Sequence, residues 1–124
     1  LSRIARGQSI PAASYIAMLQ QRAPLLAQFN AAMADVDALL LPTVPATAPA
    51  IAPLLADDAA FFAANALMLR NTSVFNFYDL PALSIPAPAL AGELPVGLML
   101  VGHRMRDRSL LAVGVAVEQA LGQR

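Results

Sequence analysis

Residues 71–86 read NTSVFNFYDLPALSIP and hold the end of one secondary-structure element and the start of another. The polar run 71–73 predicts a break after a preceding helix. The aromatic run 75–78 predicts a short turn or helix, and residues 83–86 predict a strand. This stretch therefore places helical structure directly before a strand.

Upstream of this stretch, the pattern predicts a strand, a connector and a helix. Residues 38–41 form a short apolar run stopped by Pro42, which is typical of a strand buried on both faces. Residues 43–53 alternate Pro, Ala and Thr and predict an extended connector. Asp57 or Asp58 then caps a helix that runs to the polar break.

The first part of the chain predicts one long helix, from Ser9 to about Ala34. Ser9 can cap this helix, and Pro11 suits its first turn. Pro24 should kink or split it, because proline removes a backbone donor. A broad apolar face is formed by Tyr15, Met18, Leu19, Leu25, Leu26, Phe29 and Met33.

The last part of the chain predicts a turn over 87–93, a strand over 95–101 and a helix over 108–121 that Asp107 caps. This last helix is apolar nearly all round, which predicts burial on two sides. The whole order of strands and helices predicts an α/β fold in which helices cover a sheet. Because two or three strands make a poor sheet alone, we expect the sheet to need further strands.

The composition indicates apolar surface that this chain does not cover by itself. The chain has 124 residues and 13.0 kDa, with 58% hydrophobic residues, 13% charged residues and a mean hydropathy of +0.60. Typical domains carry about 25% charged residues. We therefore expect either a strongly oligomeric protein, such as a homo-oligomer, or a piece of a longer one.

Charge and patterning exclude several classes of partner. The net charge is +0 and the pI is about 6.8, so no basic surface for nucleic acid or anionic lipid is expected. The longest uncharged run, 38–56, contains four prolines and cannot form a spanning helix. We expect a cytoplasmic protein with no membrane span and no nucleic-acid partner.

The residue types also limit the chemistry. The chain has no Cys, and every basic side chain is Arg, so neither a thiolate nor a lysine is available. His103 is the only histidine and follows an apolar run beside Arg104, which favours a loop histidine without a special role. The carboxylate pairs Asp35/Asp37 and Asp57/Asp58 have no other metal-ligating residues beside them in the sequence. The residues therefore predict no metal site and no catalytic set within this chain.

Three stretches taken together resemble the C-terminal part of the amidase signature family. They are DALLLPTVP at 37–45, NTSVFNFYDLPALSIP at 71–86 and LPVGLMLVG at 94–102. The resemblance covers essentially the whole chain, in order and at consistent spacing. It implies that residues 1–124 are the C-terminal part of a single amidase domain whose N-terminal part carries the catalytic residues.

The resemblance implies an α/β/α layered fold with a large mixed central sheet. Family members hydrolyse carbon–nitrogen bonds of amides with a Ser–cis-Ser–Lys triad and no metal or organic cofactor. The partners it implies are a small-molecule amide substrate and the N-terminal part of the same protein. This chain has Asp79 where many members have Gly, which leaves the substrate preference open.

Within the chain, the resemblance assigns substrate-binding residues but no catalytic ones. Thr72 and Phe75 match positions near the acyl side of the substrate in some relatives, and Phe77 adds a further apolar group. The alternative is that Thr72 ends a helix and that the two phenylalanines pack in the core. Asn76 is expected to hydrogen-bond backbone near the pocket. Gly97 is expected to allow close packing between strands.

Two other functions remain open at this point. The first is the A subunit of glutamyl-tRNA amidotransferase, which shares the fold and works in a multisubunit complex. The second is a non-catalytic oligomerising or binding module that is complete at 124 residues. Genes for the partner subunits beside this one would favour the A subunit. The native mass and thermal melting of this chain alone would distinguish a complete module from a piece of a longer protein.

Overall fold

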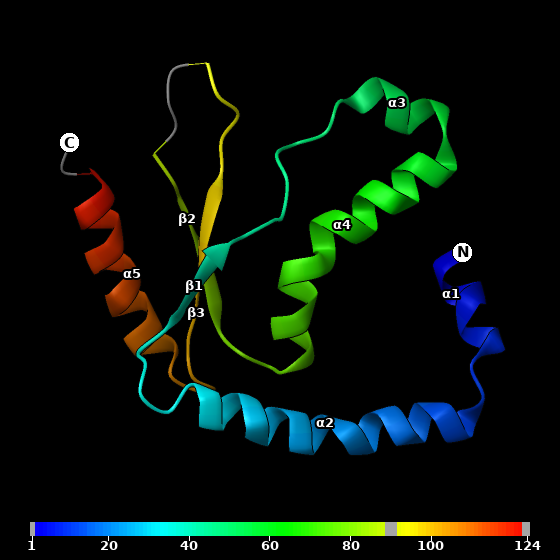
Figure 1. Cartoon of the computed structure of the whole chain (residues 1–124), viewed down its shortest axis with the longest axis horizontal. Coiled ribbons are helices and arrows are strands. Elements are labelled where there is room, and N and C mark those ends of the chain that lie inside the picture. The colour runs from blue at the N-terminus through cyan, green and yellow to red at the C-terminus, as the bar shows by residue number, and fades with distance from the viewer. Residues whose placement is uncertain (1, 89–91, 123–124) are drawn as a thin grey trace. The chain divides into compact units, whose positions relative to one another are not determined.

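The computed structural model describes residues 2–88 and 92–122, and the chain forms two compact units, Leu1–Ala34 and Asp35–Arg124. The first unit is helical and contains α1 (Ser2–Ala5), the 3-10 helix η1 (Arg6–Ser9) and α2 (Ala12–Ala32) (Figure 1). The second unit contains the remaining helices and the sheet.

The long helix was predicted correctly, but its start was not. Pro11 is the N-cap of α2 and makes no side-chain hydrogen bond to the helix, and the predicted cap Ser9 ends η1 instead. The carbonyl of Pro11 accepts a backbone hydrogen bond from the amide of Tyr15 at 3.1 Å. Pro24 lies inside α2 without splitting it, because the helix loses only one donor there and continues on both sides.

The second unit is built on a three-stranded antiparallel sheet in the order β1-β3-β2. The strands are β1 (Leu39–Pro42), β2 (Ala82–Pro86) and β3 (Gly97–Val101). The central strand β3 pairs with both neighbours, and Val101 is fully buried. The described strands are all antiparallel, so they do not by themselves form the large mixed sheet that the resemblance implies.

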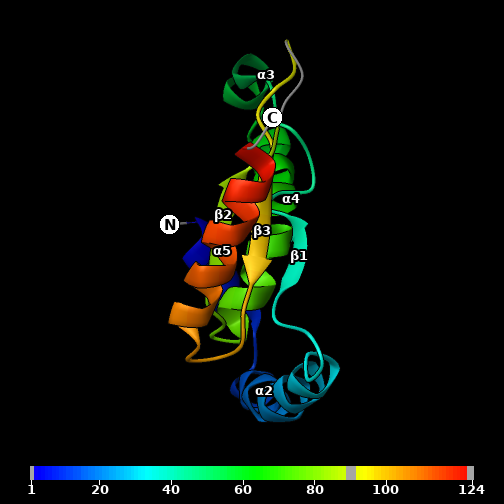
Figure 2. The same ribbon diagram turned by 90° about the vertical axis from the view of Figure 1, so that its left-hand side faces the viewer.

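Three helices accompany this sheet: α3 (Ile51–Ala56), α4 (Asp58–Phe77) and α5 (Asp107–Gly122). Figures 1 and 2 show α5 on one face of the sheet and the second half of α4 on the other. The α5 side holds the core cluster of Ile85, Leu100 and Leu110. The predicted α/β class is confirmed, with helices on both faces of the sheet.

Several predicted elements differ from the structure in their limits. The extended connector ends at Ala50 because α3 starts at Ile51, and Pro53 is accommodated in the first turn of that short helix. The strand predicted over 95–101 begins at Gly97. The turn predicted over 87–93 lies partly outside the described residues. In β1, alternate residues are exposed, so its predicted burial on both faces is wrong within this chain.

Candidate functional site: a cavity between α4 and the sheet

The wall of the site on the helix side is the C-terminal half of α4. Asp57 caps the start of this helix, as predicted, and accepts a hydrogen bond from the amide of Ala59 at 2.8 Å. The break predicted at residues 71–73 is wrong, because α4 continues to Phe77. The hydroxyls of Thr72 and Ser73 donate to carbonyls of the preceding turn, at 3.3 Å and 3.2 Å, so they fit inside the helix.

The helix ends two residues after Phe75 in a tight, hydrogen-bonded turn. The amide of Leu80 donates to the carbonyl of Phe75 at 3.1 Å, and the amide of Asp79 donates to that of Asn76 at 3.2 Å. This pair of bonds is a Schellman motif with Asp79 in the left-handed position, at φ 52°. The turn leads directly into β2 and so fixes where Phe75 lies relative to that strand.

A cavity of about 240 Å³ lies between this part of α4 and the sheet. The helix contributes Thr72, Phe75 and Asn76, and the other lining residues are Thr43, Ala82, Leu83, Ser84 and Met99. No charged side chain is among these lining residues. The cavity thus combines apolar and aromatic walls with hydroxyl and amide groups, which is the mixture typical of small-molecule sites.

The structure places the three predicted site residues differently. Thr72 is half-buried and Phe75 is only 6% exposed, and both line the cavity. Phe75 is therefore both a core residue and a wall of the cavity. Phe77 is 43% exposed, does not line this cavity and packs against Tyr78 with ring centroids 5.4 Å apart. Two residues after Phe75, it faces a different side of the helix.

Sequence reasoning missed the polar residues on the sheet side. Thr43 Oγ1 and Ser84 Oγ lie 2.6 Å apart and form a hydrogen bond across β3. A Cβ at Gly97 would lie 2.6 Å from Ser84 Oγ and 2.7 Å from Thr43 Oγ1, so Gly97 leaves the space in which they meet. Gly97 therefore has a packing role, as expected, and the atoms that approach it belong to the Thr43 and Ser84 side chains. The signal in the sequence is a glycine inside an apolar strand.

A side chain of α4 also holds the helix to the end of β1. Asn71 Nδ2 donates to the carbonyl oxygen of Pro42 at 2.8 Å. Because Thr43 follows Pro42 directly, this bond sets the position of Thr43 relative to Thr72. Asn71 therefore positions one wall of the cavity against the other, a role that its place in the predicted helix break concealed.

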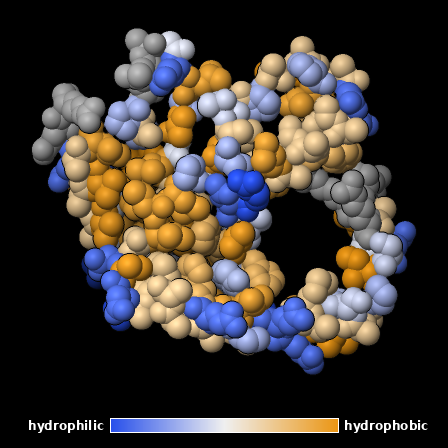
Figure 3. Space-filling model, in the orientation of Figure 1, coloured by the Kyte–Doolittle hydropathy of each residue, from blue (hydrophilic) through white to orange (hydrophobic). Residues whose placement is uncertain are grey.

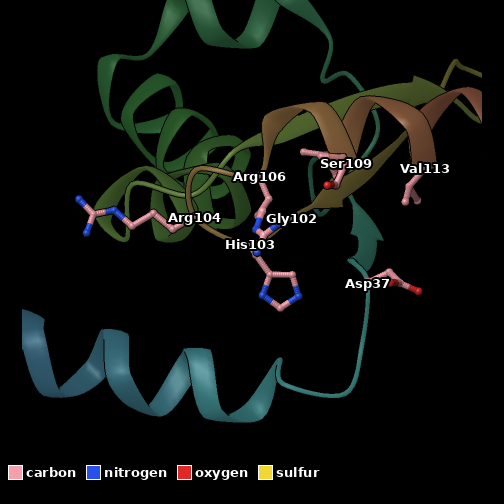
Figure 4. A pocket seen from close by; sticks show the side chains of 8 residues that line it. Asp37, Gly102, His103, Arg104, Arg106, Ser109 and Val113 are labelled. Carbon is pink, nitrogen blue, oxygen red and sulfur yellow. The ribbon is translucent and has the colours of Figure 1, made fainter.

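A second hollow, of about 370 Å³, lies near the start of α5. Figure 4 shows Arg104 and Asp37 on opposite sides of His103, with their side chains pointing away from each other. His103 Nε2 is 2.8 Å from the carbonyl oxygen of Val36, and Arg104 lies 3.8 Å from the Asp79 carboxylate. The charged groups do not converge, and His103 ties its loop to the segment before β1.

Metal-binding and membrane-spanning features are absent from the part of the chain that the structure describes. No group of three or more His, Cys, Asp or Glu side chains that could hold a metal ion occurs there. None of the described helices has the length and hydrophobicity needed to cross a membrane.

Comparison with known proteins identifies the family. The sequence model of the Amidase family matches residues 2–111, and the chain therefore belongs to the amidase family. A crystal structure of an amidase covers 95% of this chain and 27% of its own, with a TM-score of 0.76 and 27% identity. The crystal structure of the A subunit of glutamyl-tRNA(Gln) amidotransferase from Thermotoga maritima covers 98% of this chain and 26% of its own, with a TM-score of 0.71 and 29% identity.

Curated relatives differ in the activities that their names give. A 2-amino-5-chloromuconic acid deaminase from Comamonas testosteroni is 36% identical over 72% of this chain and 19% of its own length. The A subunit of glutamyl-tRNA(Gln) amidotransferase from Halobacterium salinarum is 36% identical over 81% of this chain and 22% of its own. The fatty acid amide hydrolase of Medicago truncatula is 31% identical over 94% of this chain and 19% of its own. The chain thus spans about a fifth of the length of these relatives.

Proposed function

We propose that this chain forms the substrate-pocket wall, part of the central sheet and the covering helices of an enzyme that hydrolyses carbon–nitrogen bonds of amides. The observation that carries the proposal is the cavity between α4 and the sheet, which Thr72 and Phe75 both line in a chain of the amidase family. In this proposal, Thr72 and Phe75 contact the acyl side of the substrate within the cavity, and the exposed Phe77 contacts a part of the substrate that lies outside the cavity.

The proposed mechanism uses a serine nucleophile that lies outside residues 1–124. The nucleophile attacks the amide carbonyl, the amine leaves, and water then releases the acid from the acyl-enzyme. A Ser–cis-Ser–Lys triad needs a lysine, and this chain contains none. The chain's own contribution is therefore to bind and orient the acyl group against a nucleophile on another part of the protein.

The exposed hydrophobic surface supports this place within a longer protein. Figure 3 shows a broad hydrophobic area over α5 and the neighbouring strands. On α5, Leu111 is 60% exposed and Val115 is 53% exposed. Extended apolar patches on a protein surface mark places where other protein surface docks. In this proposal, the N-terminal part of the same amidase domain covers them.

A second candidate function is that of an amidotransferase A subunit. It is favoured by the similarity to the Halobacterium salinarum relative and to the Thermotoga maritima structure. A stand-alone amidase releases amine from small amides without other subunits. An A subunit within a multisubunit complex needs its partner chains, so genes for those chains beside this one favour the second candidate.

Assays of two samples test the leading proposal. The full-length protein should release amine from a panel of aryl and aliphatic amides, and replacing its triad lysine by alanine should abolish turnover of every substrate. Residues 1–124 alone should release none, because the chain has no Lys and no Cys and His103 is engaged with the backbone. Saturable amine release by residues 1–124 alone, or none by the full-length protein, contradicts the proposal.

A further inference from the structure

The hydroxyl pair of Thr43 and Ser84 depends on three strands of the sheet. Thr43 follows β1, Ser84 lies in β2, and Gly97 of the central strand β3 leaves the space between them. The two oxygens are 2.6 Å apart, which is a short hydrogen bond between hydroxyls. Both side chains line the cavity of about 240 Å³.

The pair has one more hydrogen atom than it uses. Two hydroxyl groups carry two O–H donors, and only one hydrogen can lie between the two oxygens. Among the described residues, the bond between Thr43 and Ser84 is the only hydrogen bond of either side chain. The second O–H is thus available to donate to a bound molecule. The Thr72 hydroxyl on the helix wall already donates to the Leu69 carbonyl.

The lining of the cavity indicates which acceptor the pair would bind. No Arg or His lines it, so a carboxylate would find no compensating cation there. A neutral oxygen has a smaller desolvation cost and needs only one donor. The apolar side chains of the lining are those of Phe75, Ala82 and Met99, since the Leu83 side chain packs on the α5 face of the sheet. The cavity therefore fits an apolar chain that carries one neutral oxygen.

We propose that the Thr43–Ser84 hydroxyl pair binds a neutral oxygen acceptor, such as an ether or ketone oxygen, in the acyl portion of the amide substrate. This inference rests on the proposed function, because it takes the cavity as part of the substrate pocket. The pair is a specificity-determining group and takes no part in breaking the amide bond. The pair should make the enzyme prefer amides whose acyl chain carries such an oxygen over purely aliphatic amides of the same length.

The test compares two amides of equal chain length, one aliphatic and one with an ether oxygen in place of a methylene group. In the full-length protein, the double variant Thr43→Val/Ser84→Ala should lower kcat/KM for the ether amide by roughly three- to tenfold, the contribution of one hydrogen bond. Both hydroxyls are removed because either one alone could still donate to the ether oxygen. Turnover of the aliphatic amide should stay within about twofold, since its methylene group accepts no hydrogen bond.

Two further variants separate recognition from folding. Ser73→Ala removes a hydroxyl on α4 that donates to the Arg70 carbonyl and does not line the cavity, so it should alter turnover of neither amide. Gly97→Ala keeps both hydroxyls but places a Cβ within 2.7 Å of them, so it should lower the preference for the ether amide in the same direction. Thermal melts of all variants show which remain folded. If Gly97→Ala does not fold, the double variant Thr43→Val/Ser84→Ala decides.

Failure of the hydroxyl-pair role and failure of the amidase proposal give different results. An equal loss on both amides, or no loss on either, overturns the role of the hydroxyl pair while leaving the amidase proposal standing. If the wild-type protein hydrolyses neither amide, the amidase proposal fails, and calorimetry of ether and aliphatic amide binding then decides. Tighter binding of the ether amide that is lost in the double variant Thr43→Val/Ser84→Ala supports the role of the hydroxyl pair, and equal binding of the two amides by the wild-type protein overturns it.

Discussion

Gly114 of α5 packs directly against Leu83 of β2, and a Cβ at position 114 would lie 2.9 Å from Leu83 Cδ2. Both residues belong to the interface that holds α5 on the sheet. Glycine inside a helix is destabilising by roughly 0.5–1 kcal/mol relative to alanine. The helix tolerates this cost because a larger residue at position 114 would push the Leu83 side chain out of its place.

This contact predicts coupling between the two positions. Gly114→Ala should fail to gain the roughly 0.5–1 kcal/mol that helix propensity alone would give, because the Leu83 side chain must shift away from the new Cβ. In a Leu83→Ala background the same change should become stabilising, with a coupling free energy of about 1–2 kcal/mol measured by denaturant unfolding. Gly122→Ala is the matched control, since a Cβ there meets nothing within 4 Å. Additive effects of the first two changes would contradict the contact.

The left-handed backbone conformation of Asp79 predicts how substitutions at this position change the stability of the protein. Its φ of 52° at the end of α4 is a conformation that glycine adopts freely, whereas it costs most other residues about 1–2 kcal/mol. Unfolding free energies should therefore fall in the order Gly or Asp, then Ala, then Val at this position. Asp79→Asn tolerates the same backbone and removes the charge facing Arg104, so it should be close to wild type. If Asp79→Asn lowers the unfolding free energy as much as Asp79→Ala does, the ion pair with Arg104 stabilises this turn and the backbone conformation of residue 79 does not limit its stability.

Thr72 and Phe75 predict different effects, because only Phe75 is deeply buried. Phe75→Ala should cost about 3–5 kcal/mol of stability and should also shift the ranking of short-chain against bulky acyl amides. Thr72→Val should leave the melting temperature nearly unchanged and shift that ranking by roughly ten- to two-hundredfold in kcat/KM. Rankings that are unchanged in both variants would remove these residues from the substrate pocket.

The exposed side of α5 predicts the solution behaviour of this chain. Residues 1–124 alone should bind a hydrophobic dye or self-associate, because Leu111 and Val115 remain more than half exposed. Replacing both by Gln should reduce dye binding without lowering the melting temperature. A monodisperse monomer with a sharp, cooperative melt and no dye binding would favour the alternative of a complete binding module.

The sequence predicted element types well where one local signal dominates. Asp57 caps α4 as expected, and each of the three expected strands is present. The errors occur where polar side chains find partners that the pattern does not reveal. Thr72 and Ser73 satisfy their hydroxyls within the helix, and Asn71 bonds a strand end 29 residues earlier in the chain. The polar run that predicted a helix break is therefore a well-anchored part of α4.

The candidate site was predicted only on its helical side. Thr72 and Phe75 could be proposed from the family resemblance, because they lie in one contiguous stretch. Thr43 and Ser84 are 41 residues apart, and only the pairing of both strands with β3 brings their hydroxyls together. Asp79 departs from the residue that many family members have, and its position in the Schellman turn gives it a backbone role.

The antiparallel sheet leaves β1 and β2 as edge strands within the described residues, and each ends at a proline. Because proline has no N–H to donate, Pro42 and Pro86 set a limit to the length over which a further strand can pair. Any added strand can thus join each edge over only a few residues. The prolines restrict the register of such an addition, and they also protect the exposed edges against growth into an indefinite intermolecular sheet.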